Sequence, residues 1–342
     1  MNKAPHVRRN TLRLLWLVLL IGMTGCSEQQ KLYTALKAYQ HRMASVLEVP
    51  SPVVPTVGLA AYPSIKTLNR NIPSAHIPLA EFYQLKNCQL ATLVAQRNTP
   101  LGRTQYPSTR YLYEVELLQA IEPCLNNQDD QPLTGTLRNW QADKQQKLPL
   151  AWANLLQTSS EVKQALSANQ GFIQGNEQDG LNQTLAALHY LEKLRTEPTA
   201  NRDMLENHLA NLQQYQLPAR LWRSQMLLGA SLEQTTRWLV RNEKLIQCPK
   251  GRTSKTAEYL SNVFQLFFIQ KIQAIAGKLN AYHYQLAPLL TQLTTHPQIH
   301  PSFSGLILAH LIEGFTTYKT AMDNHIRFWQ GLYQRCGLNP GR

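Results

Sequence analysis

The sequence predicts an all-α fold: a bundle of several helices preceded by an extended, proline-rich segment. Apolar residues recur at spacings of three and four along most of the chain, which is the periodicity of one helix face. No run of alternating, β-branched residues bounded by turns predicts a strand. Long helical segments joined by short connections indicate antiparallel packing.

The composition is that of a folded protein. Of the 342 residues, 43% are apolar and 16% are charged, which is enough apolar material for a packed core. The length fits one large domain or two ordinary ones. The net charge is +13, from 34 basic and 21 acidic residues. We therefore expect most of the chain to fold.

Residues 1–25 have the layout of a secretory signal peptide. They contain four basic residues and no acid, with an apolar run at positions 14–21. The run is too short for a comfortable membrane span. The chain is therefore expected to be exported.

Cys26 directly follows Met23, Thr24 and Gly25, and this order resembles the lipobox of bacterial lipoproteins, although leucine is more usual than Met23. The resemblance implies that the Cys26 thiol is diacylated, that the signal is cut before it, and that its amino group is acylated, for example by palmitate. Several acyl chains, at about 0.8 kcal/mol per buried CH₂, hold a protein on a membrane. By resemblance to sorted lipoproteins, Ser27 in place of aspartate after the cysteine implies that the protein is moved to the outer membrane, where it faces the periplasm. An ordinary cleaved signal or an uncleaved anchor is the alternative.

Loss of residues 1–25 lowers the net charge from +13 to +9, because four basic residues and no acid are removed. Outside the inner membrane the available polyanions are anionic lipids, lipid A phosphates and cell-wall polymers, so nucleic acid is not an expected partner. Anionic lipid and an envelope protein are candidate partners beside the membrane itself. The alternative is an ordinary solvated surface, because the charges form no long basic run.

Four cysteines remain after the lipobox. An even number in an oxidising compartment predicts two disulfides, and four cysteines allow three pairings. We expect nearest-neighbour pairing, Cys88 with Cys124 and Cys248 with Cys336. Cys88 falls within an expected helix and the other three near helix ends. A metal site is the alternative, but paired CxxC spacing is lacking.

The expected order along the chain begins with the anchor and a helix in residues 26–49. Its apolar stripe is Leu32, Leu36, Tyr39, Met43 and Val46. Repeated prolines make segment 50–77 extended. Apolar residues between the prolines favour a strap laid over the body, with a tether as the alternative. Residues 78–342 are expected to form the helical domain.

In this domain, one helix is expected from Pro78 to about Gln96, and the next begins at Ser108 as N-cap. Pro149 is expected to separate two helices, and Pro288 to interrupt a long one. The glycine-containing stretch 169–180 is a predicted loop. The further helices are expected at about 133–147, 149–157, 160–168, 181–195, 200–214, 218–246 and 255–287. A turn is expected at 296–301, and a last helix follows it and runs toward Cys336.

The sequence contains no HExxH, GxSxG or GxxxxGK[ST] motif, so no catalytic, cofactor-binding or metal-binding residue is predicted. His310 and Glu313 form a weak metal-ligand pair, and a buried, hydrogen-bonded histidine is the favoured interpretation. Asp323 and His325, two apart, do not face each other on a helix. An enzyme whose catalytic groups come from distant positions is the alternative to a role without catalysis.

Residues 248–268 combine a loop, three basic residues and the start of an aromatic helix. A helix start offers backbone N–H groups to an anion, so Lys250, Arg252 and Lys255 are candidate anion contacts. A solvent-facing loop that caps the helix is the alternative. The phenylalanines at 264–268 are expected in the core rather than in a ligand pocket.

Four features span most of the mature chain: the lipobox at Cys26, YQHRMASVLEVP at 39–50 followed by prolines, LVAQRNTPLGR at 93–103, and CPKGRTSKTAEYLSNVF at 248–264. Their order resembles a family of bacterial envelope lipoproteins known only as domain-of-unknown-function family 3080. That family has no established activity. The resemblance therefore implies the location and unity of the chain, and it transfers no catalytic residue.

These observations predict a lipid-anchored, periplasm-facing protein with a binding or scaffolding role. The alternatives are a hydrolase or transferase acting on cell wall or lipid, and a protein that recognises an anionic glycolipid. A deep pocket lined by acids and histidines favours the enzyme. An exposed apolar or basic face favours a partner or a membrane surface.

Overall fold

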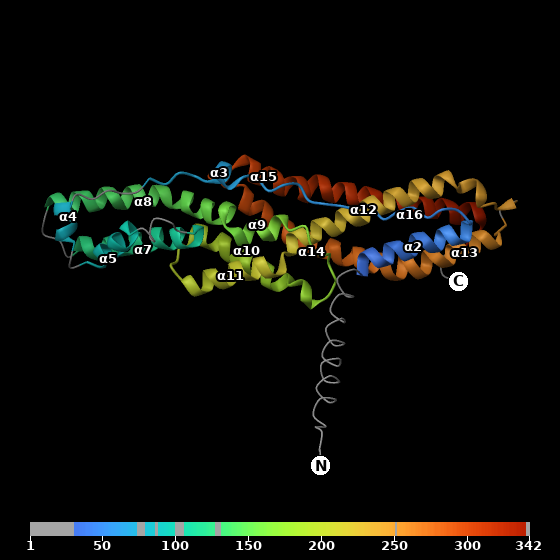
Figure 1. The fold of residues 1–342 in the computed structure, drawn as a ribbon, viewed down its shortest axis with the longest axis horizontal. Coiled ribbons are helices and arrows are strands. Elements are labelled where there is room, and N and C mark those ends of the chain that lie inside the picture. Colours follow the sequence, from blue (N-terminus) through green and yellow to red (C-terminus); the bar gives the residue numbers. More distant parts are fainter. Residues whose placement is uncertain are drawn as a thin grey trace, which may run out of the picture.

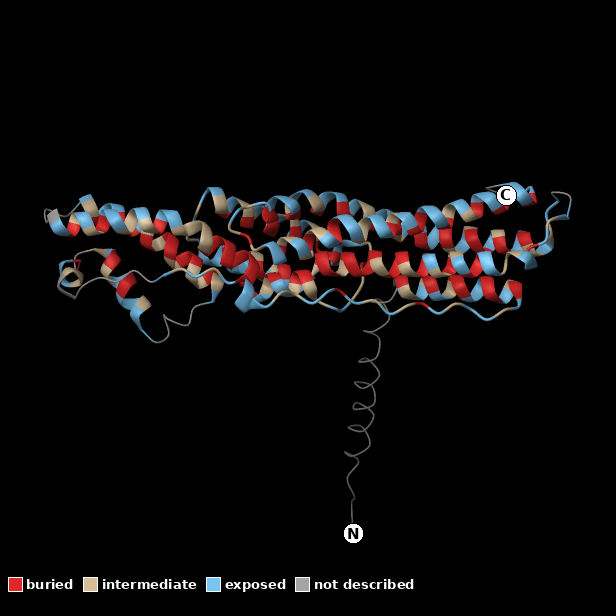
Figure 2. Ribbon diagram, turned by 90° about the horizontal axis from the view of Figure 1, so that it is seen from above, coloured by how far each residue is buried: buried red, intermediate tan, exposed pale blue. Residues whose placement is uncertain are grey.

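The structure is a computed structural model, and it describes residues 31–73, 79–85, 88–99, 106–126, 131–249 and 252–339. These residues contain helices and connecting segments but no strand, so the all-α prediction is confirmed. The long helices lie roughly along one axis and make an elongated molecule (Figure 1). Buried residues recur along each long helix (Figure 2), as the periodicity of the sequence predicts.

The α-helices of the described residues are joined mostly by short connections. They are α2 (Lys31–Leu47), α3 (Ile65–Leu68), α4 (Leu79–Gln84), α5 (Gln89–Asn98), α7 (Pro107–Asn126), α8 (Gln131–Thr158), α9 (Ser160–Ser167), α10 (Leu181–Thr196), α11 (Arg202–Tyr215), α12 (Leu217–Arg241), α13 (Lys255–Val263), α14 (Gln273–Thr294), α15 (Pro301–Leu308) and α16 (Phe315–Cys336). Two π-helical segments, Phe264–Ile272 and Ala309–Gly314, continue α13 into α14 and α15 into α16.

One half of the molecule is a bundle of α2, α12, α16 and the continuous helix α13–α14 (Figure 1). The α2 stripe predicted from the sequence is buried, except that Leu47 takes the place expected for Val46. Helices α12 and α16 approach closely at Gly229, where an added Cβ would lie 3.1 Å from the backbone Cα of Tyr318. Glycine at this position therefore allows the two helices to pack.

The opposite half contains α5, α7 and α8 and has an apolar cluster of its own. A disulfide between Cys88 and Cys124 joins the start of α5 to the end of α7, with 5.5 Å between the two Cα atoms. The cluster consists of Leu85, Leu90, Leu93, Val94, Leu117, Ala120, Ile121, Cys124, Leu133 and Leu137. The disulfide is therefore part of the packing at this end of the molecule.

Residues 50–64 run in an extended conformation along the bundle (Figures 1 and 2). Trp238 Nε1 donates a hydrogen bond to the Pro50 carbonyl at 2.9 Å, and Tyr62 Oη donates one to the Gln157 carbonyl at 3.0 Å. Leu59 is buried in the main core. These contacts hold the proline-rich segment against α12 and α8, and its last residues lead into the short helix α3.

Two expected breaks do not occur. Pro149 lies inside the single helix α8, and Pro288 lies inside α14, which continues to Thr294. A proline in a helix removes one hydrogen bond and crowds the preceding turn. Here buried residues on both sides, such as Leu286 and Leu290 around Pro288, hold the two parts of the helix in register.

An expected single helix is divided instead. The span 78–96 contains α4 and α5, and Cys88 is the N-cap of α5 rather than a residue within a helix. The Cys88 amide donates to the Leu85 carbonyl at 2.8 Å, and the disulfide to Cys124 is formed at the same residue. The following helix begins at Pro107 and not after an N-cap at Ser108, because proline suits the first helical position.

The second disulfide joins Cys248 to Cys336, so both bridges have the nearest-neighbour pairing that the sequence predicts. It links the segment before α13 to the last residue of α16, with 5.1 Å between the Cα atoms. Thr253 Oγ1 also donates to the Cys336 carbonyl at 2.8 Å. The start of α13 is thereby fixed to the end of the chain's last helix.

Candidate functional site

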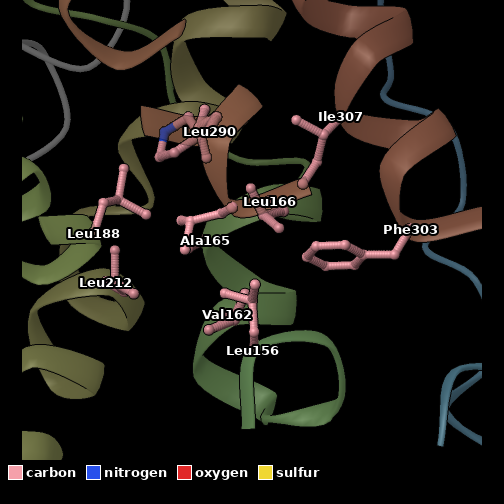
Figure 3. A pocket seen from close by; sticks show the side chains of 11 residues that line it. Leu156, Val162, Ala165, Leu166, Leu188, Leu212, Leu290, Phe303 and Ile307 are labelled. Atoms are coloured by element: carbon pink, nitrogen blue, oxygen red, sulfur yellow. The ribbon is translucent and has the colours of Figure 1, made fainter. Parts of the chain in front are cut away.

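One small, enclosed hollow among the described residues is part of the core. It lies between α8, α9, α10, α11, α12, α14 and α15, and Figure 3 shows the side chains that line it. Its volume is about 10 Å³, and its lining is entirely apolar. A hollow of this size holds about one water molecule and no ligand.

A second hollow is lined by polar side chains and is called here the polar pocket. It has a volume of about 280 Å³ and lies between the loop 169–180, the end of α11 and the start of α12. Its lining residues are Gln170, Gly171, Phe172, Gln174, Gln178, Gln214, Tyr215, Gln216 and Arg220. Five of these nine residues are glutamines, so amide groups that both donate and accept hydrogen bonds dominate the pocket.

Arg220 at the wall of the polar pocket is held in place by several oxygen atoms. Its guanidinium donates to the Phe172 carbonyl at 2.9 Å and to the Tyr215 carbonyl at 3.2 Å. It also forms an ion pair with Asp179, at 2.6 Å between Nη2 and Oδ1. These three contacts connect the loop 169–180 to α12 and connect α12 to the end of α11.

Both oxygens of Asp179, which is completely buried, accept hydrogen bonds from the loop. Oδ1 accepts from the backbone N–H of Gln174 at 2.9 Å, and Oδ2 accepts from the backbone N–H of Gly175 at 2.7 Å. Tyr282 Oη donates to Oδ2 at 3.3 Å, and burial followed by the charge of Asp179 raises the pKa of Tyr282 to about 12. Asp179 therefore shapes the loop and neutralises Arg220.

The backbone around the polar pocket is left-handed at several positions. Gly180 has φ 72°, and an added Cβ there would lie 2.1 Å from the ring of Tyr215, so only glycine fits. Gln216, at the junction of α11 and α12, has φ 47° although it carries a side chain. Such a conformation costs free energy and persists only where the surroundings hold it.

A third hollow, called here the basic groove, lies between α2 and the π-helical segment of α13–α14. Its volume is about 340 Å³, and Lys31 and Lys271 are among its lining residues. The Lys271 ammonium lies 4.8 Å from the centre of the Phe267 ring. The other lining residues are Thr34, Ala35, Ala38 and Ile275. The groove thus combines two cations with an apolar floor.

His325 is completely buried at the centre of the helix bundle and is hydrogen-bonded on both ring nitrogens. Thr236 donates to the Leu232 carbonyl at 2.7 Å, so its oxygen accepts from His325 Nδ1 at 2.8 Å. Nε2 then accepts from Tyr39 Oη at 2.8 Å and from Trp329 Nε1 at 3.1 Å. This arrangement fits only the neutral imidazole, and burial lowers the pKa of His325 to about 3.

Two further histidines, His283 and His310, stack on aromatic rings in the core. His283 lies 3.5 Å from Phe315 and His310 lies 4.6 Å from Trp222, measured between ring centres. Nδ1 of His283 and Nε2 of His310 are buried without a hydrogen-bond partner. Burial lowers the pKa of both, that of His283 to about 4.

Comparison with known proteins places the chain in a family. The model of the family described as a protein of unknown function, DUF3080, matches residues 36–340. The chain belongs to this family. It matches no curated protein and no solved structure.

Two of the site residues predicted for this DUF3080 chain, Cys26 and Lys250, lie outside the described residues. Arg252 and Lys255 are exposed beside the first turn of α13. Ser254 caps this turn, because its hydroxyl oxygen accepts from the Ala257 amide at 3.3 Å. Arg252 and Lys255 thus lie near the start of α13, where the Ser254 side chain already caps the helix.

The two weak histidine pairs are not brought together. His310 is buried whereas Glu313 is exposed, and His325 is buried whereas Asp323 is exposed. Among the residues that the structure describes, no three histidine, cysteine or acidic side chains gather as a metal-binding group. Of the three phenylalanines, those at 264 and 268 are core residues, and Phe267 is half-buried at the basic groove.

Sequence reasoning missed the polar pocket. The sequence pattern of 169–180 predicts only a loop with three glycines, and it gives no reason to select Gln214, Gln216 or Arg220. The one available signal is the concentration of glutamine and glycine around Asp179, repeated as QQYQ before Pro218. In the described part of the chain, no helix is both long and apolar enough to cross a membrane.

Proposed function

We propose that this DUF3080 chain is a lipid-anchored binding or scaffolding protein of the bacterial envelope, attached through Cys26 to the outer membrane and facing the periplasm. The two disulfides carry this proposal, because such bridges persist in oxidising compartments such as the periplasm. The signal-like residues 1–25 and the lipobox-like order before Cys26 support the same location.

The chemistry of the hollows favours binding over catalysis. In the part of the chain that the structure describes, none of the three hollows is lined by a carboxylate or a histidine. Asp179, which pairs with Arg220 at the wall of the polar pocket, already accepts hydrogen bonds on both oxygens. A general acid or base must instead reach the substrate with a proton to give or take.

Metabolic labelling with an alkyne palmitate tests the anchor. The wild-type chain is expected to be labelled and to sediment with outer membranes, and Cys26→Ala to be unlabelled. Ser27→Asp serves as a matched control, which we expect to be labelled but retained in the inner membrane. Equal labelling of wild type and Cys26→Ala, or wild type without label, would contradict the proposal.

A second candidate function is recognition of anionic lipid, and the basic groove favours it. Lys31 is five positions after Cys26, and five extended residues span at most about 18 Å. An anchor at Cys26 would therefore keep Lys31 and Lys271 close to lipid headgroups. Each basic residue near an anionic surface contributes about 1 kcal/mol, and salt screens this contribution.

Vesicle flotation of the unlipidated Cys26→Ala chain tests this function. On vesicles containing anionic lipid, Lys271→Glu is expected to weaken binding by about tenfold at low salt, because one attraction becomes a repulsion. Lys163→Glu, at an exposed lysine of α9, is the control and should change binding less. Binding that is absent at low salt, or that both variants weaken equally, would remove the basic groove as the lipid contact.

A further inference from the structure

We propose that the polar pocket is a binding site for a neutral saccharide of one or two sugar units. This inference rests on the proposed binding role and names the ligand class for it. The pocket holds five glutamines, two aromatic residues and an arginine whose charge is neutralised. A volume of about 280 Å³ fits a ligand of that size and not a polymer.

The lining of the pocket favours a neutral ligand over an anion. Arg220 is the lining residue with a charge, and Asp179 lies 2.6 Å from it with no exposure to solvent. The buried carboxylate cancels the potential that would attract a phosphate or a carboxylate. A hydroxyl group needs both a donor and an acceptor, and a glutamine amide supplies both.

The aromatic lining offers apolar surface for the C–H faces of a sugar ring. Tyr215 lines the pocket and packs against Gly180, which leaves no room for another side chain on that side. Phe172 lies beneath the Arg223 guanidinium, 4.7 Å from the ring centre. The rings of Tyr215 and Phe172 therefore have fixed positions. A sugar ring can lie against them while the sugar hydroxyls face the glutamine side-chain amides.

The loop that carries the pocket is already ordered. The Ile173 amide donates to Ser224 Oγ at 2.9 Å, and the Arg223 guanidinium donates to the Gly171 carbonyl at 2.8 Å. At the start of the loop, Asn169 Oδ1 accepts from the Leu59 amide of the extended segment at 2.8 Å. A ligand would thus bind without first having to order the loop, and preorganisation of this kind raises affinity.

One local feature of the backbone points to a ligand rather than to packing alone. Gln216 holds a left-handed backbone that glycine would adopt without strain. Such strain is typical of functional sites, because the side chain is then needed where it stands.

Saturation-transfer NMR on the full-length lipidated chain tests the proposal, in a detergent without a sugar headgroup. The probes are the neutral disaccharides maltose, cellobiose and N,N′-diacetylchitobiose, each added alone. Wild type is expected to bind at least one of them with an affinity that hardly changes between about 0.05 M and about 0.5 M NaCl, because no net charge is involved. Binding of none of the three probes, or binding lost at the higher salt, overturns the proposal.

The double variant Gln178→Ala/Gln214→Ala removes two exposed amides of the pocket and should leave the fold intact. We expect it to weaken binding by about tenfold or more. Gln273→Ala/Gln285→Ala, at two exposed glutamines of α14, is the matched control and should bind as wild type. Equal affinities of the two double variants overturn the proposal.

Gln216→Gly separates binding from folding. We expect this variant to unfold at a higher temperature than wild type, because the backbone strain is relieved, and to bind the probe more weakly. Unchanged affinity in Gln216→Gly would overturn the role of Gln216 in the site. The anchor and the pocket are tested by separate measurements. Cys26→Ala is expected to lose the palmitate label and to bind the saccharide as wild type does, so a failure of the anchor proposal would not be mistaken for a failure of the pocket proposal.

Discussion

Replacing Glu114 by alanine is expected to lower the free energy of unfolding by about 3–5 kcal/mol. Glu114 on α7 forms an ion pair with Lys144 on α8, at 2.9 Å, and both side chains are 2% exposed. Arg110 also contacts Glu114, at 2.5 Å. Removal of the carboxylate leaves the Lys144 ammonium in the protein interior without its counter-charge, and an uncompensated buried charge is costly.

Urea unfolding of the full chain measures this effect. Glu197→Ala is the control, because Glu197 pairs with Lys193 at 3.4 Å on the surface, where both side chains are more than half exposed. Surface pairs of this kind contribute about 0–1 kcal/mol. The double variant Glu114→Met/Lys144→Met should recover most of the stability, since neither charge then remains buried. A Glu114→Ala chain as stable as Glu197→Ala would contradict the interpretation.

Acid is expected to destabilise the protein strongly well before its carboxylates are protonated. His325 and His283 have pKa values lowered by burial to about 3 and about 4, whereas both titrate near 6.5 in the unfolded chain. Below pH 6.5 both histidines therefore bind a proton in the unfolded chain but stay neutral in the folded chain. The stability is present above pH 6.5 and is lost as the pH falls toward these lowered values.

Each of the two histidines should lower the unfolding free energy by about 1.4 kcal/mol per pH unit, or about 5 kcal/mol for both together at about pH 4.5. The reason is visible around His325, where Tyr39, Thr236 and Trp329 occupy both ring nitrogens and no carboxylate is bonded to the ring. A proton added to Nε2 would face the Trp329 N–H, which is itself a donor.

Urea unfolding at several pH values between 7.5 and about 4.5 checks this expectation. His283→Leu removes one titrating group together with its unpartnered Nδ1, so its stability should fall less steeply with acid than that of wild type. His41→Gln, at an exposed histidine of α2, should leave the slope unchanged. A His283→Leu slope equal to that of wild type would exclude His283 as a source of the acid sensitivity.

Helical periodicity in the sequence was sufficient to predict the helix class and most helix faces. Leu32, Leu36 and Tyr39 are buried as their spacing of three and four predicts, because a helix places such residues on one side. The nearest-neighbour disulfides were also predicted, because three of the four cysteines fall near expected helix ends, where a bridge can join neighbouring helices.

Helix continuity was not predictable from local propensity. Pro149 and Pro288 have the residue type that breaks helices, yet both lie inside long ones. Packing of buried side chains on either side outweighs the single lost hydrogen bond, and this gain depends on neighbours far away in the sequence. The division of 78–96 at Cys88 likewise depends on a cysteine 36 residues later.

The sequence by itself determined that the chain is helical and which faces are apolar, because these follow from the spacing of residues close together in the chain. Only the tertiary structure assembled the polar pocket, in which Gln174 and Asp179 of one loop meet Arg220 of α12. Glutamines have no periodic signature, and the contacts join segments about 40 residues apart. The same holds for His325, whose neutral state is decided by Tyr39, 286 positions away.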